Sequence, residues 1–137
     1  MLTQRLIGPV GTVTARLELA GLANGQRAGL CCLGKPAAWL MVEQTAEMHR
    51  LRLEAGDKTT TGPVLAASQS AVWLRMTHAM DKAQFYYSVD GVIFTPIGEP
   101  YALTRWCWMG ARPGLFSYNS TAPKGFVDVD WLRYDYQ

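Results

Sequence analysis

Apolar and polar residues alternate with a period of two through much of this chain, and this pattern predicts β-strands. The clearest case is TVTARLELA, at 12–20, where every second residue is apolar: Val13, Ala15, Leu17 and Leu19. Successive side chains of a strand point to opposite faces, so this segment predicts a strand with one buried face. The segment AVWLRMTHAM, at 71–80, predicts a second such strand, whose buried face is made of Val72, Leu74, Met76 and Met80.

Shorter segments with strand-like composition follow along the chain, and turn residues separate them. They are RAGLCCL, AAWLMVEQ, MHRLRLE, AQFYYS, VIFTPIG, GLFSYN and FVDVDWLRYDY. The pair Asp90-Gly91 predicts a tight two-residue hairpin turn between two aromatic strands. The polar segment 54–63 predicts a loop, and no long segment keeps a helical period. About ten short strands in series predict an all-β fold, an antiparallel two-sheet β-sandwich of the jelly-roll type, as one domain over 1–137.

Composition and charge narrow the class of protein. Hydrophobic residues make up 49% of the chain and charged residues 18%, which is typical of a globular domain and excludes a disordered one. The Lys and Arg residues are scattered and the net charge is only +2, so we expect no nucleic-acid partner. No apolar run is long enough to span a bilayer and the first residues, MLTQRLIGPVG, contain no signal-peptide core, so we expect no membrane partner. The compartment of a bacterial parent protein, cytoplasmic or secreted, stays open.

Candidate groups for catalysis or metal binding are few. Asp128 and Asp130 lie two residues apart on one face of the last predicted strand, a spacing that a glycosidase carboxylate pair could have. No third acidic residue joins them on that face, so we expect no catalytic residue. Asp130 with backbone carbonyls could hold a structural calcium ion, since this cation prefers oxygen ligands, and no cofactor is otherwise required. The remaining alternative is a solvated strand face.

The cysteines and histidines do not form a recognisable metal or nucleophile motif. Cys31 and Cys32 are adjacent, so on a strand they point to opposite faces and are expected to be buried thiols rather than a disulfide. His49 and His78 stand apart from any Cys/His cluster with ligand spacing.

Two tryptophans, Trp106 and Trp108, lie in the glycine-rich segment WCWMGARPGLFSYNS, and in an extended chain they share one face. Exposed Trp rings can stack on the C–H face of a sugar, and polar neighbours can bind its hydroxyls. Arg105, Arg112 and Asn119 are candidates for that polar role. The alternative is that each Trp packs in the core.

Five segments in series resemble one known family. They are LTQRLIGP, NGQRAGLCCLG, AQFYYSVDGVIFTPIGEPY, WMGARPGLFSYNS and GFVDVDWLRY, and together they span nearly the whole chain. This series is similar to the C-terminal concanavalin A-like β-sandwich of family 43 glycoside hydrolases, the β-xylosidases and α-arabinofuranosidases. The resemblance implies a jelly roll fused to a catalytic five-bladed propeller, which this chain is too short to contain. It also implies that an aromatic residue at the position of Trp108 reaches the propeller's sugar pocket, although the family more often has Phe there.

Two main hypotheses follow, because similar domains are also classed as xylan-directed carbohydrate-binding modules. In the first, the domain is non-catalytic and binds xylan or xylo-oligosaccharides through Trp106 and Trp108, with Arg105, Arg112 or Asn119 on the hydroxyls. In the second, it is a structural partner that packs on the catalytic propeller and completes its pocket. A free-standing sandwich hydrolase is the third alternative, and the missing acid and base disfavour it.

Overall fold

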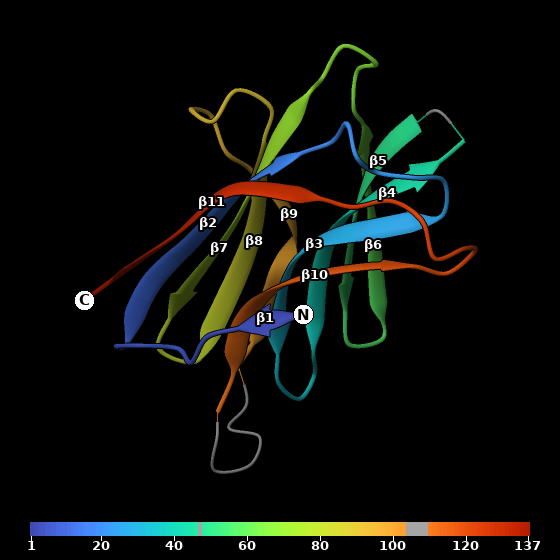
Figure 1. Cartoon of the computed structure of the whole chain (residues 1–137). Coiled ribbons are helices and arrows are strands. Elements are labelled where there is room, and N and C mark those ends of the chain that lie inside the picture. Colours follow the sequence, from blue (N-terminus) through green and yellow to red (C-terminus); the bar gives the residue numbers. More distant parts are fainter. Residues whose placement is uncertain (47, 104–109) are drawn as a thin grey trace.

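The computed structural model describes residues 1–46, 48–103 and 110–137, which form two antiparallel β-sheets stacked as a sandwich (Figure 1). The six-stranded sheet has the order β1 (Leu2–Thr3), β10 (Arg112–Asn119), β3 (Gln26–Leu33), β4 (Ala38–Thr45), β5 (Met48–Ala55), β6 (Lys58–Val64). The five-stranded sheet has the order β11 (Asp128–Tyr136), β2 (Val10–Glu18), β7 (Ala71–Ala79), β8 (Lys82–Ser88), β9 (Thr95–Ala102). The predicted all-β, concanavalin A-like sandwich is confirmed. Over the described ranges, the chain forms no helix long and apolar enough to cross a membrane.

The core lies between the sheets and follows the alternation in the sequence. The apolar residues predicted to be buried in 12–20 are all buried: Val13, Ala15, Leu17 and Leu19. They pack in one cluster with inward-facing leucines of the six-stranded sheet, among them Leu30, Leu40, Leu51 and Leu53. The period of two therefore places the polar residues of these strands on the two outer faces of the sandwich.

Strand β7 confirms most of the second predicted face and corrects its end. Val72, Leu74 and Met76 are buried, but Met80 lies beyond the strand, is 78% exposed and has a φ of 56°. The inward position after Met76 belongs to His78, which is only 2% exposed. Strand alternation places residue 78 on the inner face whatever its polarity, and the chain turns before residue 80 can continue it.

The hairpin of β8 and β9 is confirmed, but its tight two-residue turn is wrong. The two strands pair directly, and the connection between them is the six-residue loop 89–94. The Asp90 carboxylate accepts hydrogen bonds from the backbone N–H groups of Val92 and Ile93, at 2.8 and 2.9 Å, so it organises a longer loop. Gly91 has the expected positive φ of 74°, and a Cβ there would lie 2.8 Å from the Trp73 indole. The loop folds over Trp73, which the hairpin signal in the sequence does not encode.

The predicted loop 54–63 is also wrong, because most of it belongs to strands. Residues Lys58–Val64 form β6, which pairs with β5 at the edge of the six-stranded sheet. The segment TTTGPV is exposed along most of its length, so it carries no apolar alternation to mark it. Threonine favours extended backbone, and Pro63 is tolerated because an edge strand leaves backbone N–H groups unpaired.

Candidate functional site

Three of the predicted sugar-binding residues, Arg105, Trp106 and Trp108, lie outside the described residues. The described chain stops at Leu103 and resumes at Gly110. Leu103 and Ala111 line the same surface hollow, together with Leu6, Pro9 and Met80 at one end of the sandwich. Leu103 and Ala111, which lie on either side of residues 104–109 in the sequence, therefore line one mostly apolar hollow.

Arg112 begins β10 and lies at the same end of the sandwich. Its register partner in β3 is Leu33, and Arg112 is half-buried. Residues 114, 116 and 118 follow it at alternate positions, so Arg112 belongs to the row of side chains that β10 presents on the outer face of the six-stranded sheet.

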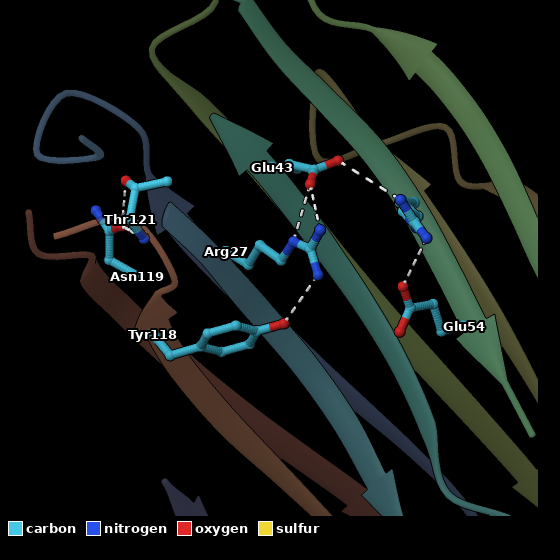
Figure 2. Close-up of polar contacts among 7 residues, drawn as sticks. Arg27, Glu43, Glu54, Tyr118, Asn119 and Thr121 are labelled. Atoms are coloured by element: carbon cyan, nitrogen blue, oxygen red, sulfur yellow. Dashed lines mark hydrogen bonds and ion pairs between the residues drawn. The ribbon is translucent and has the colours of Figure 1, made fainter. Parts of the chain in front are cut away.

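Asn119 has a structural role in this fold. Its Nδ2 group donates to the carbonyl oxygens of Asn24 and Lys124, both at 3.0 Å. Its Oδ1 accepts from the N–H and hydroxyl of Thr121, both at 2.9 Å, and from the Ala122 N–H at 3.1 Å. Figure 2 shows Asn119 and Thr121 side by side at the end of β10. Both amide protons are used within the protein, so Asn119 has no spare donor for a sugar hydroxyl.

Asp130, the candidate calcium ligand, contacts a cation from the protein itself. It is the extra residue of a β-bulge in β11, and its Oδ2 lies 3.0 Å from Arg16 Nη1, which also pairs with Glu18. Among the residues that the structure describes, no three His, Cys, Asp or Glu side chains are grouped to hold a metal ion. A calcium ion at Asp130 would have to lie beside the Arg16 guanidinium, so calcium binding stays a prediction that this geometry does not favour.

The Tyr134 hydroxyl links the N-terminal segment to the five-stranded sheet and also contacts His78 of the same sheet. The His78 Nε2 and the Tyr134 hydroxyl are 2.9 Å apart, and the Ile7 N–H donates to the same hydroxyl at 2.7 Å. Burial lowers the pKa of His78, because the charged imidazolium is poorly solvated inside the protein. The ring is therefore neutral at pH 7 and acts as a structural hydrogen-bonding group.

Cys31 and Cys32 point to opposite faces of β3, as the sequence predicts, and both are buried free thiols. Cys32 belongs to the main core, whereas Cys31 packs with Met41 and Phe116 in a small cluster on the outer face of the six-stranded sheet. Burial raises the pKa of Cys31 to about 12, so the thiol is protonated and unreactive at neutral pH.

The outer face of the six-stranded sheet carries aromatic and charged side chains in register across four strands. Three rows run from β10 to β5: Tyr118, Arg27, Glu43, Arg50; then Phe116, Gly29, Met41, Arg52; then Gly114, Cys31, Trp39, Glu54. The residues between them in β3, including Ala28 and Leu30, are in the main core, which fixes these rows on the outer face.

Charged groups on this face hold one another in fixed positions. Arg27 lies between Tyr118 and Glu43, with Nη1 3.2 Å from the Tyr118 hydroxyl and Nε 2.8 Å from Glu43 Oε1 (Figure 2). Arg52 pairs with Glu54 at 2.9 Å and lies 4.0 Å from the second oxygen of Glu43. The hydrogen bond with Tyr118 and the contact with Glu43 raise the pKa of Arg27 despite partial burial.

Comparison with known proteins decides the family. The model of the β-xylosidase C-terminal concanavalin A-like domain of family 43 glycoside hydrolases matches residues 1–135. The chain belongs to this family. It is 32% identical over 138 residues to a β-xylosidase from Formosa agariphila, covering 98% of this chain and 23% of that enzyme. The chain thus spans about a quarter of this curated relative.

Two solved structures have the same fold. One is a family 43 glycoside hydrolase engineered to show both endo-xylanase and exo-arabinofuranosidase activity, with a TM-score of 0.87 and 24% identity over 97% of this chain and 30% of that one. The other is a protein from Bacteroides eggerthii described as a bifunctional GH43-CE protein. Its TM-score is 0.84, and its identity is 27%, over 97% of this chain and 18% of that one. In each case the sandwich is one part of a larger glycoside hydrolase.

Sequence reasoning missed the outer-face residues of β3, β4 and β5. The signal was present in MHRLRLE, where Arg50, Arg52 and Glu54 alternate with the buried Leu51 and Leu53, but not in the apolar run WLMV that precedes Glu43. What the sequence could not supply was the register that sets Arg27, Glu43 and Tyr118 beside one another, because β10 is far from β3 along the chain.

Proposed function

We propose that this chain is a non-catalytic accessory domain of a family 43 β-xylosidase and that it binds xylan or xylo-oligosaccharides. The observation that supports this most directly is the mostly apolar hollow at the end of the sandwich, lined by Leu6, Gly8, Pro9, Met80, Asp81, Leu103 and Ala111. Leu103 and Ala111 lie in the sequence on either side of the segment that carries Trp106 and Trp108. A sugar site needs apolar surface for its C–H face and a few polar groups for its hydroxyls, and this end of the domain offers the first.

The roles proposed for individual residues rest on the sequence, since Arg112 follows Ala111 of the hollow along the chain but belongs to the outer-face row of β10. Trp106 and Trp108 are the proposed stacking platforms, and Arg105 and Arg112 the proposed hydroxyl ligands. Asn119 is left out, because its amide is committed to the loop at 120–124. Such an open half-site corresponds to a Kd of about 1 mM or somewhat below, or about 4 to 5 kcal/mol of binding free energy.

The second candidate function is docking onto the catalytic propeller, with the domain completing the catalytic pocket without binding sugar alone. Met80 favours it, since a methionine that is 78% exposed beside an apolar hollow is typical of a surface that another protein covers. The relatives leave room for such a partner, because this domain is less than a third of each matched enzyme.

Affinity electrophoresis separates the two candidates. The wild-type chain and the variants Trp106→Ala and Trp108→Ala are run through gels with xylan, arabinoxylan, β-glucan or cellulose, beside a gel without polysaccharide. We expect retardation by xylan that a Trp variant loses while its melting temperature stays within about 2 °C of wild type. Wild-type mobility that no polysaccharide changes would reject sugar binding and favour docking. A large loss of melting temperature in Trp108→Ala would instead identify that residue as core.

A further inference from the structure

The outer face of the six-stranded sheet has a groove that neither the sequence motifs nor the family match assigns. Trp39, Met41, Glu54, Phe116 and Tyr118 line it, and its volume is about 170 Å³. Three of these residues form a continuous aromatic strip, which we define as Trp39, Phe116 and Tyr118. The Trp39 and Phe116 rings meet edge to face at 5.1 Å, and the Phe116 and Tyr118 rings are stacked at 6.1 Å.

The strip borders a buried cluster on this face. Gly29 lies in the row between Phe116 and Met41, and a Cβ at this position would overlap the Leu40 carbonyl oxygen, so glycine is required where β3 lies against the backbone of β4. Phe116 belongs to the buried cluster with Cys31 and Met41 and is only 6% exposed. Tyr118, at one end of the strip, is 45% exposed.

Planar charged groups border the strip and balance one another. Arg27 and Glu43 pair at 2.7 Å beside Tyr118, and Arg52 and Glu54 pair at 2.9 Å beside the groove. These two guanidinium groups and two carboxylates balance one another beside the groove, while Arg50 and Arg112 lie farther out on the same face. Their mutual contacts fix donors and acceptors in place before any ligand arrives, which lowers the entropic cost of binding.

We propose that this groove binds a short neutral oligosaccharide, with sugar rings packed along the aromatic strip and hydroxyl groups bound by Glu54, Arg52 and Arg27. Aromatic rings accept the C–H faces of sugars, and fixed carboxylates and guanidinium groups bind hydroxyls. An acidic ligand is disfavoured at the groove itself, because the two arginines that border it, Arg27 and Arg52, are each paired with a glutamate.

This site uses none of residues 104–109, and it rests on the proposed function only for the choice of xylotetraose as the first probe. It gives the domain a second sugar surface on a sheet face, apart from the hollow at the end of the sandwich.

The test is a titration of the 137-residue chain with xylotetraose, with cellotetraose as the second probe. Tyr118→Ala is expected to weaken binding of at least one probe by about tenfold or more, with a small change in melting temperature because Tyr118 is exposed. Tyr118→Phe keeps the ring and loses one hydrogen bond with Arg27, so its affinity should stay within about fivefold of wild type. Tyr136→Ala, on the edge strand β11 of the other sheet, is the matched control for removing an exposed tyrosine and should bind as wild type does.

The outcomes distinguish this site from the proposed site at 104–109. Loss in Tyr118→Ala with binding kept in Trp106→Ala and Trp108→Ala supports the groove. Wild-type affinity in Tyr118→Ala with loss in a Trp variant overturns the groove and leaves the proposed function standing. A wild-type chain that binds neither probe overturns both, and equal losses in Tyr118→Ala and Tyr136→Ala overturn the groove.

Discussion

Replacing Asn119 by alanine tests whether this residue binds sugar or instead holds the loop at 120–124 in place through its hydrogen bonds. The substitution removes the two hydrogen bonds to Asn24 and Lys124 and the three from Thr121 and Ala122. A net hydrogen bond contributes about 0.5 to 1.5 kcal/mol, and these are mostly exposed, so the lower end applies. The expected loss of unfolding free energy is therefore about 2 to 3 kcal/mol, which lowers the melting temperature of a domain of this size by roughly 10 °C.

Differential scanning calorimetry or thermal circular dichroism measures this loss directly. Ser120→Ala is the control, because Ser120 is the exposed neighbour in the same loop. Affinity electrophoresis of the same two variants gives the second readout, and retardation by xylan should survive in Asn119→Ala at temperatures where it is folded. The reasoning would be refuted if Asn119→Ala kept the wild-type melting temperature and lost retardation, because the amide would then serve the ligand and not the loop.

Two further predictions follow from buried and paired titratable groups. Burial lowers the pKa of His78 in the folded chain, whereas in the unfolded chain the imidazole has its ordinary pKa of about 6.5. As the pH falls, the unfolded chain therefore binds a proton that the folded chain does not, so the free energy of unfolding should decrease from about pH 7.5 to about pH 5.5. Urea unfolding at both pH values checks this, and His78→Gln should reduce the pH dependence; a wild type equally stable at both would contradict it. Because Asp130 is paired with Arg16, adding a chelator should leave the melting temperature unchanged, and a drop of several degrees that calcium reverses would show a bound ion instead.

The sequence predicted those strands in which apolar and polar residues alternate along the chain. The inward faces of β2 and β7 appear in the chain as every-second-residue apolar patterns, and the structure buries them as expected. Strand β6 was not predicted, because it is an edge strand with mostly exposed residues and therefore shows no alternation of apolar and polar residues. The longer loop at 89–94 was not predicted, because the Asp-Gly pair alone does not show that the Asp90 carboxylate accepts from the Val92 and Ile93 N–H groups or that Gly91 lies against Trp73.

The candidate site was predictable only in part, for a similar reason. Trp106 and Trp108 could be singled out from the composition of their segment, but they lie outside the described residues, and the aromatic residues of the outer face, Trp39, Phe116 and Tyr118, were not predicted to form a site. The charges that surround Phe116 come from β3, β4 and β5, and only the pairing of β10 with β3 brings Arg27 to Tyr118. The role of Asn119 could not be read from the sequence either, since its partners include Asn24 from a different loop.

The central claim is that this chain binds a xylan-type oligosaccharide by itself. Its most direct test is a titration with xylotetraose followed by the amide and indole N–H signals in two-dimensional NMR, which detects binding in the millimolar range. We predict saturable shifts with a Kd of about 1 mM or below, including tryptophan indole signals and amides of Arg112–Asn119. Signals that stay unmoved up to saturating sugar would contradict the claim and leave docking onto the catalytic propeller as the function of the domain.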